Sequence, residues 1–151
     1  MNDKLPKPVT LESLQAMKHR GEKIACLTAY DAGFTQVLEA AGVDMVIIGD
    51  SLGMVVMGYD STVPVTMDDM VHHAASVARA GRYSYRVVDL PYRSYTSREQ
   101  ALANARRLVD EGGADMVKLE GGVAMAGIVE HLAGQGIPVC GHIGLLPQSI
   151  E

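Results

Sequence analysis

The sequence predicts an α/β fold, in which parallel strands alternate with helices. Five short apolar runs of strand length are separated by segments of helical periodicity, and this alternation is strict along the 151 residues. Aromatic residues make up only 5% of the chain, with no Trp, so the core must consist of Val, Ile, Leu, Met and Ala. Small aliphatic side chains of this kind, together with 16 glycines, are typical of helices packed closely on parallel strands.

An amphipathic helix over residues 11–20 precedes the first predicted strand. The strands are apolar runs bounded by Gly or Pro, with little polar alternation, as in strands buried on both faces. They span residues 24–29 (IACLTA), 45–49 (MVIIG), 86–90 (RVVDL), 116–119 (MVKL) and 137–140 (IPVC). Cys26 and Cys140 lie in the first and last runs, so we expect small buried residues and neither a disulfide nor a metal pair.

The segment between the first two strands is predicted to form a helix. Phe34, Val37, Leu38 and Ala41 form an apolar stripe, and Gly42 ends it at the position where a helix commonly stops. We therefore expect this stripe to face the core.

Three further helices are predicted from their end signals and periodicity. Thr66 and Asp69 form a cap-like start to the first of them, and Thr96 with Glu99 predicts a capping box at the second. The third is expected over residues 123–133. The chain thus consists of four and a half strand–helix units behind an N-terminal helix.

Two architectures accommodate this order: an open doubly wound sheet, or part of a (β/α)8 barrel of the TIM type. No Gly-x-Gly-x-x-Gly follows the first strand, which weakens the dinucleotide-binding alternative. A full barrel usually needs roughly 250 residues. The chain is therefore either a small open-sheet protein or the N-terminal part of a longer barrel. No linker interrupts it, so we expect a single domain over residues 1–151.

Charge and hydropathy exclude some classes of partner. The formal net charge is −5 and no basic stripe is present, so we expect no nucleic-acid partner and no binding to an anionic membrane surface. The N-terminal segment lacks an apolar signal region, and no apolar run approaches membrane-spanning length. These features predict a cytoplasmic protein.

Three consecutive predicted strands end in an acid: Asp50, Asp89 and Glu120. The carboxyl ends of parallel strands open on one face, where ligands bind in both candidate folds. Three carboxylates there would repel one another unless a cation lay between them, and hard oxygen ligands favour Mg²⁺ over zinc. A single acid at a strand end is often only a helix cap or a turn former. Its repetition in three units favours a site.

Other polar residues are predicted on the same rim. Lys118 precedes Glu120 by two residues and so lies on the same side of its strand, where an ammonium suits an anionic substrate. Ser51 offers a hydroxyl directly after the second strand, and His142 follows the fifth.

Five motifs in order resemble the ketopantoate hydroxymethyltransferase family, from about residue 8 to the end. They are LTAYD (27–31), GDSLGMVVMGYDSTVPVT (49–66), VDLPY (88–92), MVKLEGG (116–122) and PVCGHIGLLPQS (138–149). The resemblance implies a (β/α)8 barrel, Mg²⁺, and transfer of a hydroxymethyl group from 5,10-methylenetetrahydrofolate to the small oxoacid 3-methyl-2-oxobutanoate. The product is 2-dehydropantoate, on the route to pantothenate and coenzyme A. A homo-oligomer is implied for the full-length enzyme.

The resemblance also implies roles for particular residues. Asp50 and Asp89 match the residues that hold the metal and contact the oxoacid, and Glu120 matches a third metal-associated acid. Ser51 and Lys118 match the serine and lysine that bind the oxoacid. His142 matches a histidine at the catalytic site, and its role is left open.

The chain departs from the family pattern in two ways. Tyr59, Tyr92 and Leu146 stand where members often have His, Phe and Thr. The family's catalytic base, a glutamate on a later strand, is expected beyond residue 151. We therefore expect the N-terminal portion of the enzyme, inactive by itself.

Two rival interpretations stay open. One is a Mg²⁺-dependent oxoacid lyase or mutase of the phosphoenolpyruvate mutase and isocitrate lyase type, although the lysine typical of its Cys-Gly-His signature is replaced by Pro138. The other is a catalytically inactive half-barrel that serves only in binding or assembly.

Overall fold

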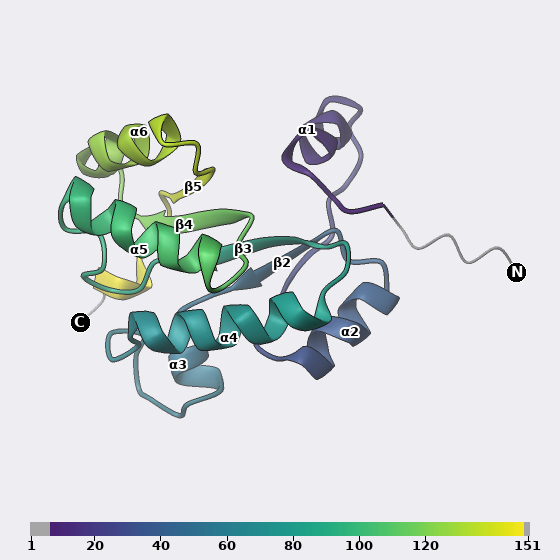
Figure 1. The fold of residues 1–151 in the computed structure, drawn as a ribbon, viewed down its shortest axis with the longest axis horizontal. Helices are drawn as coiled ribbons and strands as arrows, with labels where there is room; N and C mark the ends of the chain where they lie inside the picture. The colour runs from purple at the N-terminus through teal and green to yellow at the C-terminus, as the bar shows by residue number, and fades with distance from the viewer. Residues whose placement is uncertain (1–6, 150–151) are drawn as a thin grey trace, which may run out of the picture.

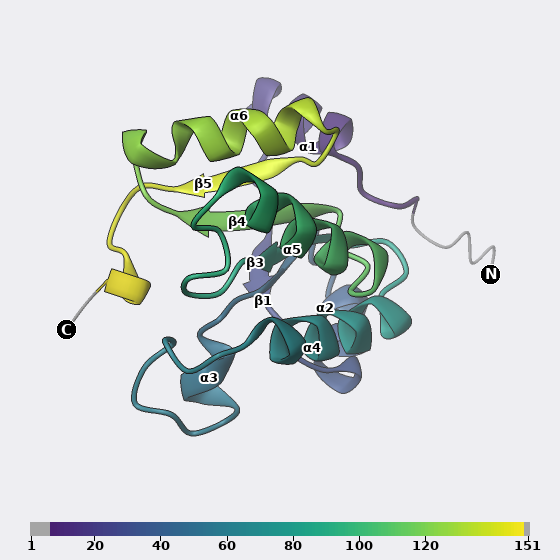
Figure 2. The same cartoon turned by 60° about the vertical axis from the view of Figure 1, so that its left-hand side comes forward.

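Five parallel strands form one sheet in the order β1-β2-β3-β4-β5, in a computed structural model that describes residues 7–149 (Figures 1 and 2). Each strand pairs in parallel with the next one along the chain. Their bounds are Cys26–Thr28, Met45–Ile48, Tyr85–Asp89, Met116–Glu120 and Val139–His142. A doubly wound sheet reverses its strand order at a switch point, whereas a barrel wall keeps the sequential order found here. The strand order therefore favours the barrel.

Helices alternate with the strands along the whole described chain. The α-helices are α1 (Leu11–His19), α2 (Ala32–Ala40), α3 (Leu52–Val55), α4 (Met67–Ala80), α5 (Arg98–Asp110) and α6 (Ala126–Gly134), and two short 3₁₀ turns are η1 (Val123–Met125) and η2 (Pro147–Ser149). Helices α2, α4, α5 and α6 contribute residues to one apolar cluster against the sheet, whereas α1 contributes Leu14 to another. Within residues 7–149, no helix has the length and apolarity to cross a membrane. The short helix α3 was not predicted.

The sheet separates two apolar clusters. Val46, Val88 and Val117 face the outer helices in the larger cluster. Residues that alternate with them face the other side, where Leu14 of α1 packs with Tyr85. The N-terminal helix thus covers part of the inner face of the barrel wall.

One predicted helix cap is confirmed. Thr66 accepts a hydrogen bond from the backbone N–H of Asp69 at 3.2 Å, and the Asp69 carboxylate accepts one from the Thr66 N–H at 2.9 Å. These reciprocal bonds satisfy two backbone donors at the start of α4.

The predicted Thr96–Glu99 capping box is wrong. The N-cap of α5 is Ser97, whose hydroxyl accepts from the Gln100 N–H at 3.2 Å. Gln100 in turn accepts from the backbone N–H and the hydroxyl of Thr96, at 2.9 and 2.7 Å. The serine one residue later competes for the cap because its hydroxyl also reaches a first-turn N–H.

The predicted core stripe of α2 is also only partly correct. Phe34 and Val37 are 67% and 65% exposed, while the buried residues of the helix are Thr35 and Glu39. Cys26, predicted to be buried, is exposed as well. All of these exposed side chains belong to β1 or α2, and β1 is an edge of the described sheet. No described element lies beyond that edge to cover them.

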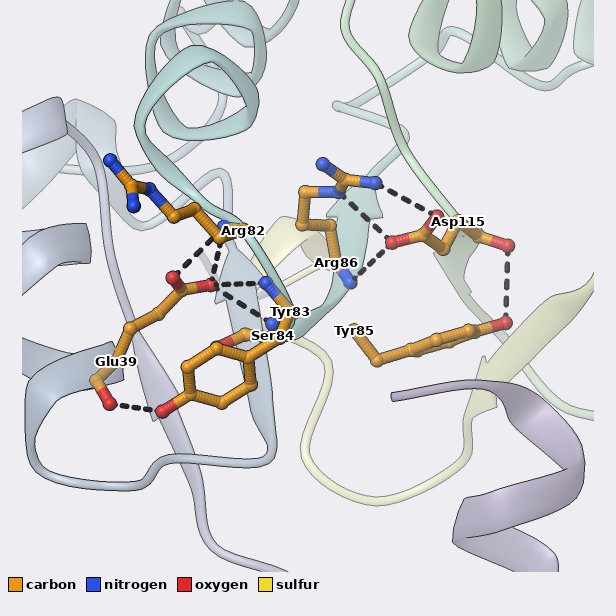
Figure 3. Close-up of polar contacts among 7 residues, drawn as sticks. All are labelled: Glu39, Arg82, Tyr83, Ser84, Tyr85, Arg86 and Asp115. Atoms are coloured by element: carbon orange, nitrogen blue, oxygen red, sulfur yellow. Dashed lines mark hydrogen bonds and ion pairs between the residues drawn. The ribbon is translucent and has the colours of Figure 1, made fainter. Parts of the chain in front are cut away.

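Polar contacts at the amino end of β3 fix its entry into the sheet (Figure 3). The Glu39 carboxylate accepts backbone hydrogen bonds from Arg82, Tyr83 and Ser84 at 2.9–3.0 Å. Arg86 donates Nε–H and Nη2–H bonds to the Asp115 carboxylate at 2.9 and 3.0 Å. These contacts lie at the opposite end of the strands from the acids described next, where residues in barrels generally serve stability.

Candidate functional site

The carboxyl ends of β3 and β4 bring a cation and an acid together. Asp89 and Lys118 are partners in register, and Lys118 Nζ lies 2.6 Å from Asp89 Oδ2. Both side chains are largely buried. The backbone N–H of Asp50, just after β2, donates to the same Asp89 oxygen at 3.3 Å. Three of the predicted site residues therefore meet at the carboxyl ends of adjacent strands.

The environment of Asp89 perturbs its proton affinity. Burial raises the pKa of this carboxyl, Lys118 lowers it and the nearby Asp50 carboxylate raises it, and the net effect is a pKa of about 6. Asp89 Oδ1 is buried and finds no hydrogen-bond donor among residues 7–149. A buried anionic oxygen without a partner is costly unless a cation or donor satisfies it.

Gln148, which was not singled out from the sequence, connects the acids. Its side-chain N–H₂ donates to Asp50 Oδ2 at 2.7 Å, and its backbone N–H donates to Glu120 Oε2 at 3.1 Å. Its side-chain oxygen accepts from the Tyr95 hydroxyl at 2.5 Å. Burial raises the pKa of Tyr95 to about 12, so this hydroxyl stays a donor. Gln148 lies inside the GLLPQS segment of the resemblance, but no local pattern distinguishes it.

Glu120 and His142 form a second pair on the same rim. They are register partners on β4 and β5, and His142 Nδ1 lies 3.4 Å from Glu120 Oε1. Alternation along β4 places Glu120 on the same face as Lys118. His142 is the last residue of β5, whereas it had been expected just after the strand.

Ser51 lies at the N-cap position of α3 and makes no side-chain cap hydrogen bond. Its side chain is half-buried and directly follows Asp50, which is only 2% exposed. The serine hydroxyl is therefore not committed to capping the helix.

The acids at the barrel mouth include two that fit a divalent cation. Across residues 7–149, no three acidic, His or Cys side chains gather into a metal-binding cluster. Glu120 is instead engaged with Gln148 and faces His142. Asp50 and Asp89 nonetheless fit Mg²⁺, because they are adjacent carboxylates and Asp89 Oδ1 lacks a donor. The three-acid ligand set stays a prediction.

Comparison with known proteins decides the family. A sequence model described as "Ketopantoate hydroxymethyltransferase" matches residues 8–151. The chain belongs to the ketopantoate hydroxymethyltransferase family. Relatives named 3-methyl-2-oxobutanoate hydroxymethyltransferase include one from Halorhodospira halophila, 59% identical over 95% of this chain and 52% of its own length. Another, from Nitrosococcus oceani, is 57% identical over 95% of this chain and 54% of its own length. The chain spans about half the length of these relatives.

Solved structures agree with the family's fold. A 2,3-dimethylmalate lyase of the PEP mutase/isocitrate lyase superfamily matches with a TM-score of 0.67 and 17% identity, over 90% of this chain and 54% of that one. A phosphonopyruvate hydrolase in complex with oxalate and Mg²⁺ matches with a TM-score of 0.61 and 12% identity, over 72% and 38%. At these identities the likeness shows the fold alone. It confirms that the described sheet is part of a TIM-type barrel.

Proposed function

We propose that this member of the ketopantoate hydroxymethyltransferase family provides the oxoacid- and metal-binding part of a 3-methyl-2-oxobutanoate hydroxymethyltransferase. The enzyme would transfer a hydroxymethyl group from 5,10-methylenetetrahydrofolate to 3-methyl-2-oxobutanoate and give 2-dehydropantoate. The observation that carries this proposal is the contact of Lys118 and Asp50 with Asp89 at the barrel mouth. For the whole enzyme we also propose a homo-oligomer located in the cytoplasm.

Asp50 and Asp89 would hold Mg²⁺, with Glu120 as the proposed third acid. When bound, Mg²⁺ supplies Lewis acidity that polarises the keto oxygen of the oxoacid and acidifies the hydrogen on C3. Gln148 holds one Asp50 oxygen through a hydrogen bond, which limits the rotation of that carboxylate. The protein would thus fix the orientation of the metal-binding oxygens before substrate arrives.

Lys118 would bind the carboxylate of the oxoacid. Its ammonium uses one N–H on Asp89, so two donors remain for an anion. The Ser51 hydroxyl is not used in helix capping and would donate to the same carboxylate. These contacts orient the oxoacid with its keto group toward the two aspartates.

Proton abstraction from C3 needs a base within hydrogen-bond reach of that carbon. The acids at the barrel mouth are assigned to the metal, and His142 faces Glu120. The proton-accepting glutamate of the family is expected beyond residue 151. We therefore expect that the 151-residue chain binds the oxoacid and does not catalyse exchange at C3.

Isothermal titration with Mn²⁺ or Mg²⁺ and 3-methyl-2-oxobutanoate tests the binding site. Asp50→Asn and Asp89→Asn should each weaken binding, because each removes an anionic ligand. Asp110→Asn, at the exposed end of α5, is the matched control and should bind as the unmodified chain does. Unchanged affinity in both site variants, with the circular dichroism spectrum preserved, would refute the carboxylate assignment.

Deuterium exchange at C3 of the oxoacid, followed by NMR in D₂O with Mg²⁺, tests the position of the base. The chain alone should give no exchange above the buffer rate. Rapid exchange that His142→Ala abolishes would show that the base lies within these residues.

A further inference from the structure

The loop that follows β3 carries one side chain to the acids of the barrel mouth. Tyr95 lies in this loop, and its hydroxyl donates a hydrogen bond to the side-chain oxygen of Gln148 at 2.5 Å. The same hydroxyl accepts a hydrogen bond from the backbone N–H of Glu120, the last residue of β4, at 3.3 Å. Tyr95 thus connects the loop after β3, the end of β4 and the turn η2.

The other partners of Gln148 settle the direction of these bonds. Its side-chain N–H₂ donates to Asp50 Oδ2 at 2.7 Å and to the Leu90 carbonyl at 3.1 Å. Both partners are acceptors, so the amide nitrogen must face them and the amide oxygen must face Tyr95. We refer to the three bonds that run from the Glu120 N–H through Tyr95 and Gln148 to Asp50 as the Tyr95–Gln148 network. Each donor in this network points toward the Asp50 carboxylate.

Burial makes the Tyr95 hydroxyl difficult to replace. Gln148 is 6% exposed and Asp50 is 2% exposed, so water has little access to the amide that joins the hydroxyl to the carboxylate. A buried amide oxygen without a donor is unfavourable. Removal of the hydroxyl therefore favours other rotamers of Gln148, and these release Asp50.

Helix α5 holds the loop in the conformation that places Tyr95. Gln100 donates to the Arg93 carbonyl at 3.2 Å, and Asn104, one turn later, donates to the Ser94 carbonyl at 2.7 Å. Arg93 has a φ of 59° and is the one non-glycine residue with positive φ among residues 7–149. L-residues adopt this conformation rarely, and it persists only where the surrounding contacts hold it. The position of Tyr95 is thus fixed from both ends, by α5 and by Gln148.

We propose that Tyr95 is a positioning residue, which holds the Asp50 carboxylate at the barrel mouth through Gln148. This inference rests on the proposed function, in which Asp50 is a metal ligand. A carboxylate held at one oxygen can bind a cation through the other. Tyr95 itself touches neither metal nor oxoacid in this role, and it acts only by keeping Gln148 on Asp50.

Titration with Mn²⁺ in the presence of 3-methyl-2-oxobutanoate tests the effect on binding. Tyr95→Phe keeps the ring and removes the hydroxyl, so it should weaken Mn²⁺ binding roughly three- to fivefold, which corresponds to one ordinary hydrogen bond. Tyr92→Phe is the matched control. Tyr92 lies in the same loop, its ring stacks with Arg93 and its hydroxyl takes no part in the network, so this variant should bind as the unmodified chain does.

A double variant separates positioning from a general loss of stability. Tyr95→Phe/Gln148→Leu should bind Mn²⁺ as weakly as Gln148→Leu alone, because Tyr95 acts through Gln148. A role in stability alone would leave Mn²⁺ affinity unchanged in Tyr95→Phe, and an independent contact with the ligand would make the two losses multiply.

NMR of the ¹⁵N-labelled, metal-free chain tests the network directly. The side-chain amide signals of Gln148 are identified by their absence from Gln148→Leu. Tyr95→Phe should shift these signals and speed the exchange of their protons with water, whereas Tyr92→Phe should leave both unchanged. This measurement needs no metal, so it decides the inference even if the unmodified chain binds no Mn²⁺, a result that would count against the proposed function alone.

Three outcomes would overturn the assignment. They are equal Mn²⁺ affinities in Tyr95→Phe and in an unmodified chain that binds the ion, losses that multiply in the double variant, or Gln148 amide signals that Tyr95→Phe leaves in place.

Discussion

Replacing Glu39 with Ala should destabilise the chain by about 2–5 kcal/mol, because it removes the carboxylate that accepts the backbone hydrogen bonds drawn in Figure 3. Three consecutive backbone N–H groups, those of Arg82, Tyr83 and Ser84, lose their acceptor. Ser84 is buried, so its N–H loses the full value of the bond, about 1–3 kcal/mol. Water can replace the acceptor at the other two, which contribute roughly 0.5–1 kcal/mol each. The total is a large part of the stability of a small domain.

The pKa of Glu39 adds a pH dependence to this prediction. Burial raises the pKa, but the backbone bonds from Ser84, Tyr83 and Arg82 together lower it further, so it lies below the ordinary value of 4.5. A carboxyl whose folded pKa is depressed contributes its stability above the unfolded value and loses it as pH falls through the folded value. The gap between the unmodified chain and Glu39→Gln should therefore be largest near neutral pH and shrink below about pH 4.5.

Urea unfolding followed by circular dichroism measures both effects. Glu22→Ala is the control, because it removes an exposed carboxylate that pairs with Arg20 at 2.7 Å, and a solvent-exposed ion pair contributes little to stability. A Glu39→Ala variant no less stable than Glu22→Ala would refute the argument that the buried N–H of Ser84 depends on this carboxylate. A constant difference for Glu39→Gln between pH 7 and pH 3.5 would refute the pKa argument.

Three other predictions concern the barrel mouth. The pKa of Asp89 is raised to about 6, so protons compete with Mg²⁺ for this carboxylate. Mg²⁺ affinity measured by titration should therefore fall by up to about tenfold per pH unit below pH 6. An affinity that stays constant from pH 5 to 7 would contradict this prediction. Gly121→Ala should lower the free energy of unfolding in urea by about 1–3 kcal/mol. The φ of Gly121 is 129°, and an added Cβ would lie 2.5 Å from Met125 Cγ. Gly122→Ala is the control and should be nearly neutral, because its added Cβ meets nothing within 4 Å. Gln148→Leu should weaken Mg²⁺ binding severalfold, because it removes the hydrogen bond that holds the Asp50 carboxylate. The far-ultraviolet circular dichroism spectrum should stay unchanged. An unaltered Mg²⁺ affinity would show that this hydrogen bond is dispensable.

Much of the fold follows from local sequence patterns. The apolar runs predicted all five strands to within a few residues, since buried parallel strands need continuous apolar residues. The acids at the strand ends were also predicted to share one rim, because the carboxyl ends of parallel strands open on one face of the sheet. Asp50 and Asp89 meet there, where the Asp50 N–H donates to Asp89 Oδ2 at 3.3 Å.

The tertiary structure decided what depends on contacts between distant segments. The sequential strand order, which separates a barrel wall from a doubly wound sheet, depends on which strands pair. The exposure of Phe34 depends on the absence of a neighbour beyond β1 among the described residues, which periodicity cannot reveal. Gln148 reaches Asp50 across 98 positions of sequence. A hydrogen bond of that range depends on the geometry of the whole sheet, so no local pattern encodes it.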